Sequence, residues 1–361
     1  MRSVWMEVSL GETINLKRGY DLPSAQRRKG MYPIYSSSGL TDYHNEYKVS
    51  GEGVITGRYG TIGEVFFSKD SFWPLNTTLY VEDFKGNYPK FIYYLLKTVN
   101  FSIFTDKSAV PGINRNHVHL YKVKIPPLSE QHAIAAILSC LDDKIANNTK
   151  INHHLEQMTQ AIWTERFGSR ESNGVLGDII ELFDSKRVPL SGNQRANMEK
   201  IYPYYGAASL MDYVDDYLFD GIYLLLGEDG TVVDNLGFPI LQYVWGKFWV
   251  NNHAHILHGR NGFTVESLYT LLKQTSVASI VTGAVQPKIN QANLKALDVI
   301  IPSMSEMDAF NALITPLFAQ IRNNSDENLI LAELRDTLLP RLMSGVLSID
   351  TESKAQYNDS I

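Results

Sequence analysis

Two stretches of this 361-residue chain place mostly apolar side chains at alternating steps of four and three residues. A period of about 3.5 residues over about four heptads is typical of a coiled-coil seam. The pattern therefore predicts two long paired helices, at 129–168 and 303–345. The first seam runs through Ile134, Leu138, Leu141, Ile145, Asn148, Asn152, Leu155, Thr159 and Ile162. The second repeats these steps 176 positions later, through Phe310, Ile314, Leu317, Ile321, Asn324, Asn328, Leu331, Arg335 and Leu338.

Four asparagines interrupt these seams near their middle: Asn148, Asn152, Asn324 and Asn328. A buried asparagine costs stability unless it has a partner, and coiled coils use such residues to fix register and partner choice. In an antiparallel pair with a pseudo-twofold axis, Asn148 would face Asn328 and Asn152 would face Asn324. The alternative is that these side chains lie on a wet edge of the seam and have little effect.

Residues at the ends of both stretches indicate where the helices begin and end. Ser303 and Glu306 have the spacing of a capping box at the start of the second helix. Gly168 is expected to end the first helix and Pro340 the second. Pro316 is expected to kink the second helix locally.

The remaining segments have the patterns of β-rich globules, and one is a copy of the other. Runs such as "GVITGRYG", "EVFFS" and "TTLYVE" cluster β-branched and aromatic residues between turns, as strands do. A helix is expected at 89–100 and again at 265–276. A repeat distance near 170 residues indicates a duplicated domain and not a solenoid. The matching pairs are "LGETINLKRGYDLP" (10–23) with "LGDIIELFDSKRVP" (176–189), "YPIYSSSGLTDYHNEY" (32–47) with "YPYYGAASLMDYVDDY" (202–217), "GRYGTIG" (57–63) with "GEDGTVV" (227–233), "FWPLN" (72–76) with "FWVNN" (248–252), and "INRNHVHLYKVKIPPLSE" (113–130) with "INQANLKALDVIIPSMSE" (289–306).

These patterns predict an α+β fold, in which two pseudo-symmetric mixed α/β domains are separated by two long antiparallel coiled-coil helices. The expected boundaries are 1–128 for the first domain, 129–168 for the first helix, 169–302 for the second domain, 303–345 for the second helix, and 346–361 for a flexible C-terminal tail.

Composition narrows the class of protein. The single cysteine, Cys140, excludes a disulfide framework and a cysteine-clustered metal site, and it suits a reducing cytosol. No stretch approaches about 20 uninterrupted apolar residues, and the start, "MRSVWMEVSL", lacks the apolar core of a signal peptide. We therefore expect a cytoplasmic protein without a membrane segment.

The net charge of −6 argues, at first, against a nucleic-acid partner. The charge is unevenly distributed, however, because residues 1–127 carry a net +5 whereas 171–302 and 303–361 carry −5 each. Only the first block has a basic excess that attracts phosphates by itself. Any DNA role of the second globule must therefore depend on local clusters or on a partner.

Four stretches resemble the DNA-specificity subunit of type I restriction–modification enzymes: "LSEQHAIAAILSCLDDKIANNTKINHHLE", "SAVPGINRN", "GVITGRYGTIGEVFF" and "LRDTLLPRLMSG". The resemblance covers roughly residues 5–347. It implies two target-recognition domains, each reading one half of a split double-stranded DNA sequence. It also implies that the helices dock two methyltransferase subunits, with restriction or translocase subunits as further partners. S-adenosylmethionine, Mg2+ and ATP would be bound by those partners, and no cofactor by this chain.

Helix length would then set the spacing between half-sites. A helix of about 38 residues spans about 57 Å, whereas one turn of DNA is about 34 Å long. Domains at the two ends of such a helix would face half-sites about one to one and a half turns apart. The second half departs from the commoner family pattern at "GEDGTVV", where Glu228 takes the place of Arg58.

Two loops of the first domain offer candidate DNA contacts. In "GEGVITGRYGTIG", Arg58, Tyr59 and Thr61 could present a cation, an aromatic ring and a hydroxyl at an exposed turn. The alternatives are ordinary turn glycines or a nucleotide loop, although a nucleotide fingerprint requires a helix where β-like residues follow here. "DKSAVPGINRN" offers Lys107, Ser108 and Arg115 to phosphates or base edges.

The alternative for "DKSAVPGINRN" is a structured turn whose asparagines bond to their own backbone, with Asn114 and Asn290 as the structural pair. The remaining candidates of the first domain lie in the basic cluster "QRRKG", for which an ordinary solvated loop is the alternative to phosphate contact, and in the small-residue stretch "IYSSSG", which would allow close backbone approach. They are Arg27, Arg28, Ser36 and Ser37.

The second domain offers counterparts that are less basic. Its candidate DNA contacts are Lys186, Arg187, Tyr205, Thr231, His253 and Lys288. The run "NNHAHILHG" could also suggest a metal site, but neither cysteine nor carboxylate lies nearby in the sequence. We expect structural or DNA-facing histidines there and no metal.

The sequence gives no sign of catalysis by this chain. It lacks an Asp/Asn-Pro-Pro-aromatic motif for adenine methylation and a P-loop for ATP-driven translocation, and no acid–base set repeats in both halves. We therefore expect a non-catalytic, sequence-specific DNA-binding subunit that recruits methyltransferase and restriction subunits. The rival hypotheses are a stand-alone DNA-processing enzyme and a protein-interaction scaffold without DNA contact.

A helix pair cannot bury all of its apolar residues against itself, so some of them are expected on faces that partners could cover. These residues are Ala135, Ile137, Cys140, Ile151, Met158 and Trp163.

Overall fold

A computed structural model describes residues 5–105, 112–283 and 285–349. The chain forms two compact units, which are Met1–Ala146 with Asn328–Ile361 (unit 1) and Asn147–Glu327 (unit 2). Two helices of 40 residues, α4 (Leu128–Phe167) and α8 (Met304–Met343), each contribute one half to each unit. Each unit therefore contains one globule and one half of each long helix. Lys107, Ser108 and most of the C-terminal tail, predicted to be flexible, lie outside the described residues.

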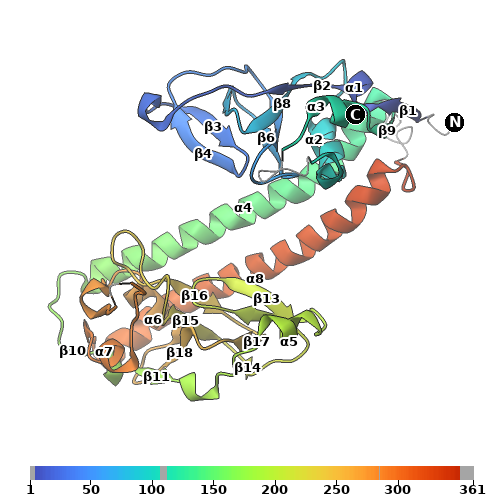
Figure 1. The fold of residues 1–361 in the computed structure, drawn as a ribbon. Helices are drawn as coiled ribbons and strands as arrows, with labels where there is room; N and C mark the ends of the chain where they lie inside the picture. Colours follow the sequence, from blue (N-terminus) through green and yellow to red (C-terminus); the bar gives the residue numbers. More distant parts are fainter. Residues whose placement is uncertain (1–4, 106–111, 284, 350–361) are drawn as a thin grey trace, which may run out of the picture. The chain divides into compact units, whose positions relative to one another are not determined.

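Unit 1 contains two antiparallel-rich sheets, drawn in blue in Figure 1. The first has the strand order β2-β8-β5-β6 and the second the order β4-β3-β7, while β1 pairs with β9. The strands are β1 (Met6–Ser9), β2 (Asn15–Arg18), β3 (Tyr32–Ser36), β4 (Gly39–His44), β5 (Gly53–Gly57), β6 (Val65–Ser68), β7 (Trp73–Pro74), β8 (Thr78–Asp83) and β9 (Lys122–Ile125). The helical elements are α1 (Leu10–Thr13), η1 (Ser24–Gln26), α2 (Pro89–Lys97), η2 (Phe101–Phe104) and α3 (Arg115–His119).

Unit 2 repeats this topology, as the internal sequence repeat predicts, with β14 as one additional strand in its second sheet. Its sheets have the orders β11-β18-β15-β16 and β13-β12-β17-β14, and in both units one pair of strands in the second sheet is parallel. The strands are β10 (Gly174–Val175), β11 (Ile180–Leu182), β12 (Tyr202–Tyr205), β13 (Leu210–Val214), β14 (Phe219–Asp220), β15 (Tyr223–Gly227), β16 (Leu241–Val244), β17 (Lys247–Val250), β18 (Ala254–Gly259) and β19 (Asp298–Val299). The helical elements are η3 (Leu176–Asp178), η4 (Asp184–Lys186), α5 (Gly192–Ala196), α6 (Val265–Leu272), η5 (Ala278–Ile280) and α7 (Gln291–Lys295).

The predicted α+β class is confirmed, and so are the two short helices expected in corresponding places. They form as α2 and α6, each a few residues shorter than expected because the C-terminal residues turn away. In α2, Phe91, Leu95 and Leu96 are buried against the first sheet and contribute about 1.5–3 kcal/mol each. The helix α6 begins at a capping pair in which Thr264 accepts a hydrogen bond from the Ser267 amide.

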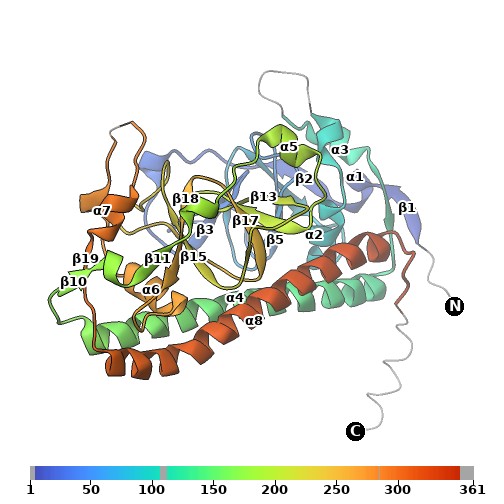
Figure 2. The same cartoon turned by 90° about the horizontal axis from the view of Figure 1, so that it is seen from below.

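The long helices form where the apolar period predicts them, and Figure 2 shows α4 and α8 along their length. Gly168 follows the last residue of α4, as expected. The predicted end of the second helix at Pro340 is wrong, since α8 continues to Met343. Leu342 and Met343 are buried in the core of unit 1, and this burial outweighs the hydrogen bond lost at the proline. Pro316 also lies within the continuous α8.

Each half of the helix pair is part of the hydrophobic core of its own globule. In unit 1, Ile134 and Leu138 of α4 are fully buried in the cluster that contains α2 and the end of α8. In unit 2, Phe318 of α8 is buried at 1% exposure against Tyr243 and Tyr269, whereas the predicted seam residue Leu317 is only partly buried. The seam therefore turns toward the sheet as well as toward the partner helix.

Three seam asparagines lie together in unit 2 with polar partners. Asn324 donates to Asn152 at 2.8 Å, and Asn152 donates to the Ser325 hydroxyl at 3.0 Å. Asn148 is buried and donates to Glu327 at 2.6 Å. The wet-edge alternative does not describe these three side chains. Asn328 belongs to unit 1, so its pairing with Asn148 stays a prediction.

Within the described part of the chain, no helix combines the length and the apolar content that crossing a membrane requires.

Candidate nucleic-acid interface

Three arginines from separate elements of unit 1 line one open cavity of about 360 Å3. Arg18 is the last residue of β2, Arg58 follows β5, and Arg115 is the first residue of α3. Leu79 of β8 and Ile113 also line the cavity. Because β8 lies between β2 and β5 in the sheet, Arg18 and Arg58, which are 40 positions apart in the sequence, lie at the same end of the sheet.

A tight backbone contact holds the Arg58 turn beside α3. The Ile113 amide donates to the Arg58 carbonyl at 3.0 Å, and Tyr59 forms a β-bridge with Gly112. A Cβ at Gly112 would lie only 2.2 Å from the Tyr59 ring, so the contact requires glycine. The Asn114 side chain caps α3 by accepting from the Asn116 amide, and Asn290 caps α7 in the same way, as the structural-pair prediction requires.

The three guanidinium groups have few acceptors of their own. Arg58 lies 4.4 Å from the ring centroid of Tyr59, and Arg115 donates to the Leu16 carbonyl at 3.3 Å. Arg18 lies 3.7 Å from Asp21, and both side chains of this pair are more than half exposed. Such an exposed pair is worth little, so the cavity keeps an excess of positive charge.

The other candidates of the first domain are distributed around this cavity and a second one. Ser37 lies beside the Arg58 turn, where its hydroxyl is 3.3 Å from the Cβ position of Gly60, and Thr61 is exposed in the same turn. Arg28 is exposed and lines a separate cavity of about 460 Å3. Arg27 lies 3.7 Å from Asp42, and Ser36 donates to the Gly39 carbonyl at 3.3 Å.

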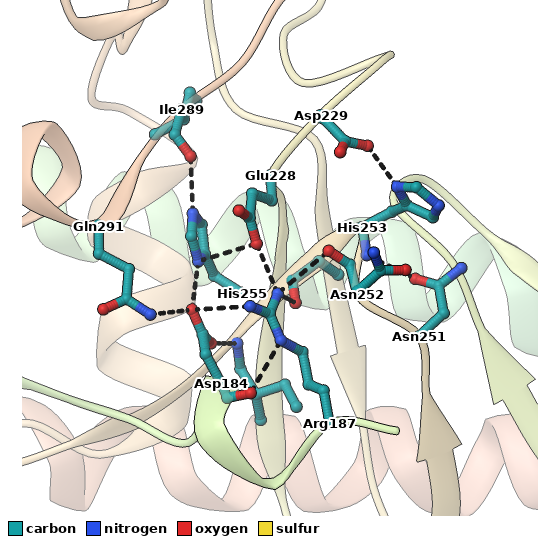
Figure 3. Close-up of polar contacts among 12 residues, drawn as sticks. Asp184, Arg187, Glu228, Asp229, Asn251, Asn252, His253, His255, Ile289 and Gln291 are labelled. Atoms are coloured by element: carbon teal, nitrogen blue, oxygen red, sulfur yellow. Dashed lines mark hydrogen bonds and ion pairs between the residues drawn. The ribbon is translucent and has the colours of Figure 1, made fainter. Parts of the chain in front are cut away.

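The corresponding region of unit 2 is an internal ionic network (Figure 3). Arg187 lies 2.5 Å from Glu228 and 3.6 Å from Asp184, and it also donates to the Ala254 carbonyl at 2.8 Å. The fully buried His255 has Nδ1 2.6 Å from Asp184 and 3.8 Å from Glu228. Two carboxylates thus hold two basic groups in the interior of the unit.

Both ring nitrogens of His255 face oxygen acceptors. Nδ1 faces the Asp184 carboxylate and Nε2 faces the Ile289 carbonyl, at 2.7 Å. A carbonyl oxygen cannot donate, so satisfying both contacts requires a ring that carries both protons. Asp184 and Glu228 place two negative charges beside this buried ring.

The two carboxylates are held in their ionised form. Burial acts to raise the pKa of Asp184, but the hydrogen bond and charge of His255, the Ile256 amide and Arg187 together lower this pKa below its ordinary value. The pKa of Glu228 is likewise lowered, because the bond from Arg187 and the charge of His255 outweigh burial.

Asp184, Glu228 and His255 are residue types that bind metals, and one ligand atom of each lies within 4.8 Å of the others. The arrangement does not fit a metal, however. Arg187 already places a cation between the carboxylates, and both His255 nitrogens are used for donation. We therefore interpret the cluster as structural.

The repeat relates the two regions position by position. Arg18, Arg58, Leu79 and Arg115 in unit 1 correspond to Asp184, Glu228, His255 and Gln291 in unit 2. Gln291 donates to Asp184 at 2.6 Å and so belongs to the network. No motif in the sequence singles out Arg18, Asp184 or Gln291. The signal that could have identified them is that basic residues of the first copy of the repeat are aligned with acidic or neutral residues of the second copy at several positions together.

The remaining candidates of the second domain lie outside or at the edge of this network. Lys186 is exposed above the Phe183 ring, and Thr231 is exposed in the turn after β15. His253 lies 2.5 Å from Asp229, and the half-exposed Lys288 lies 3.2 Å from Glu228. Tyr205 packs edge-on against Phe248. DNA contact by every candidate in both units, including Arg187, stays a prediction.

Comparison with known proteins gives one consistent family. The model of the type I restriction modification DNA specificity domain matches twice, at residues 2–157 and 173–329. The HindI specificity subunit of Haemophilus influenzae is 33% identical, with 71% of this chain and 77% of that protein covered. Another specificity subunit of that organism is 30% identical over 130 residues, so the chain spans only 33% of its length.

A solved structure supports the same fold. The S subunit of a type I restriction–modification system from Mycoplasma genitalium matches with a TM-score of 0.60 and 18% identity, covering 94% of this chain and 96% of that one. Both halves of the chain match the domain model, and both units have the same topology. The chain therefore belongs to the family of non-catalytic DNA-specificity subunits of type I restriction–modification systems.

Proposed function

We propose that this chain recognises a bipartite DNA target, with one half-site read by each unit, and recruits the subunits that methylate and cut. The observation that carries the proposal is the duplication: one topology occurs twice, on two continuous helices that run through both units. Two similar readers on one chain imply a target with two separate parts. The helices would set the number of unread base pairs between them.

Exposed apolar residues on both helices support recruitment of partners. Ile151, Met158 and Leu313 are 38%, 49% and 43% exposed in unit 2, and Leu329 and Ile330 are each 66% exposed in unit 1. Of the residues expected on free faces, Ile137 and Cys140 are also exposed, whereas Ala135 and Trp163 are buried in the globules. We propose that two methyltransferase subunits, one for each unit, cover the exposed residues.

The partners would supply the chemistry. S-adenosylmethionine would be bound by the methyltransferase subunits, and ATP and Mg2+ by restriction or translocase subunits. Because the target is genomic DNA, the complex would act in the cytoplasm.

Mapping methylated adenines in cells with and without this chain tests the proposal. We expect a two-part motif that is methylated only when the chain is present. An unchanged methylation pattern, or a motif in one piece, would contradict it. Incubation of the purified chain with DNA and Mg2+ separately tests the nuclease alternative, which requires cleavage.

A further inference from the structure

The cavity lined by Arg18, Arg58 and Arg115, called here the arginine pocket, is a site prepared for an anion. Among the described residues, Asp21 is the only carboxylate that forms an ion pair with any of the three, and that pair is exposed. Arginine presents planar, forked donors that match the oxygens of a phosphate group. Tyr59 supports Arg58 from one side, so less side-chain entropy is lost on binding.

Unit 2 reverses the charges at the same positions. Asp184 replaces Arg18, Glu228 replaces Arg58, and Arg187 replaces Asp21. The charged groups of unit 2 pair with one another, since Arg187 is only 13% exposed and contacts both Asp184 and Glu228. An anion that entered here would meet two ionised carboxylates, and a phosphate is therefore disfavoured.

We propose that the arginine pocket of unit 1 binds one phosphate of the DNA backbone, and that unit 2 makes no phosphate contact at the corresponding site. The inference rests on the proposed DNA-binding function and names one contact within it. It makes the two half-sites electrostatically unequal. Unit 1 holds DNA by a contact that is independent of sequence and sensitive to salt, whereas unit 2 lacks this contribution.

The local fold favours DNA over a nucleotide cofactor as the source of the phosphate. The glycine turn after β5 leads into strand β6 and not into a helix, so no helix N-terminus is available for a nucleotide phosphate. The other element at the pocket, α3, has only five residues. A single open pocket with three arginines instead suits one phosphate of a continuous strand.

The test compares Arg58→Ala, Arg115→Ala and the double variant with the wild-type chain, each assembled with its methyltransferase subunits. Binding to the target duplex and to an unrelated duplex is measured by fluorescence anisotropy at a series of salt concentrations. We expect each substitution to weaken binding to both duplexes by a similar factor of about ten. The slope of log affinity against log salt should fall by about one for each arginine removed.

Two further variants give the comparison its controls. Arg341→Ala removes an exposed arginine on α8 of unit 1, outside the pocket, and should change neither affinity nor slope. Lys288→Ala removes the half-exposed cation beside Glu228, a candidate DNA contact, and so tests whether this region of unit 2 contacts a phosphate. If the slope of log affinity against log salt is unchanged, the result supports the proposal that only unit 1 contacts a phosphate at this site. A slope lower by about one overturns it.

The outcomes separate this inference from the proposed function. If the assembled wild-type complex prefers its target but the pocket variants bind with unchanged affinity and slope, the inference is wrong and the proposed function stands. If the pocket variants lose only binding of inorganic phosphate, measured by calorimetry, the pocket holds a free anion and the inference is again wrong. If the wild-type complex prefers no sequence at all, the proposed function itself fails.

Discussion

At the scale of single residues, the two units show how one backbone arrangement can hold opposite charges. The end of β2 carries Arg18 in unit 1, and the corresponding position carries Asp184 in unit 2. Arg18 is more than half exposed, so water solvates it and its exposed pair with Asp21 is enough. A buried carboxylate must instead be paired, and Asp184 is paired with His255, Arg187 and Gln291.

Substitution Asp184→Asn should therefore destabilise unit 2 strongly. It leaves Arg187 and the His255 ring in the interior with one carboxylate fewer, at a cost of about 3–5 kcal/mol. Because the pKa of Asp184 is lowered in the folded state, its contribution is complete above the pKa of about 3.9 of the unfolded chain and is lost as the pH falls through the lower folded value. Urea unfolding, followed by tryptophan fluorescence, should show a large loss at neutral pH that shrinks in acid.

The exposed Asp215 in the same unit is the matched control. Asp215→Asn should change the free energy of unfolding by no more than about 0.5 kcal/mol. A loss for Asp184→Asn that is as large in acid as at neutral pH would show that the ionic role assigned to this carboxylate is wrong.

At the scale of elements, each globule is attached to its helix halves by a tyrosine, an acid and an arginine. In unit 1, Asp142 of α4 accepts from Tyr94 of α2 at 2.5 Å and from Arg335 of α8 at 2.9 Å. In unit 2, Glu266 of α6 accepts from Tyr243 of β16 and from Arg322 of α8. The arginine comes from α8 both times, although the acids occupy different elements. These contacts give each globule a defined orientation on its own part of the helices.

Asp142→Ala should destabilise unit 1 more than Tyr94→Phe does. The first change leaves both the tyrosine hydroxyl and Arg335 without this acceptor, whereas the second removes one neutral donor and should cost about 0.5–1.5 kcal/mol. Thermal unfolding of the two variants provides the comparison. Equal losses of stability in the two variants would mean that the Asp142–Arg335 ion pair adds nothing to what Arg335 already contributes through its exposed neighbour Asp336.

The asparagine pair is the second prediction for the elements. Asn152→Leu leaves the buried Asn324 amide without this acceptor, and Asn324→Leu leaves the half-buried Asn152 with only Ser325 and the Ile321 carbonyl. Each substitution alone should cost about 1–3 kcal/mol. The double substitution should cost less than the sum of the two, because it replaces both partners by apolar groups. A double-mutant cycle by urea unfolding measures the difference, and Asn323→Leu on the exposed face serves as control. Strict additivity would contradict an energetic link between the two side chains.

At the scale of the whole molecule, the sequence predicted what is periodic or repeated. Helices α4 and α8, the duplicated sheets and the asparagine cluster all follow from spacing, which needs no knowledge of tertiary contacts. The arginine pocket could not be predicted in full because it depends on β8 pairing between β2 and β5. The expectation that Pro340 ends α8 was wrong, although the predicted range 303–345 lies within two residues of the helix, because local proline preference does not include the burial of Leu342 and Met343.

The proposed role of the two helices in setting the spacing between the half-sites leads to a prediction for the whole molecule. Insertion of four alanine-rich residues in both α4 and α8, between Ala146 and Asn147 and between Glu327 and Asn328, lengthens each helix by about 6 Å. Because a base pair rises by about 3.4 Å, the unread gap of the target should grow by one or two base pairs. Each half-site sequence should stay the same, since neither globule is changed.

Sequencing of methylated adenines in cells that carry the lengthened chain measures both quantities at once. Insertion in α4 alone is the control, because it lengthens one of the two helices that link the units and leaves the other unchanged, and it should abolish methylation of either target. A lengthened chain that still methylates the original spacing would show that the helices do not set the distance. Changed half-sites would show that base recognition depends on the helices and not only on the loops of each globule.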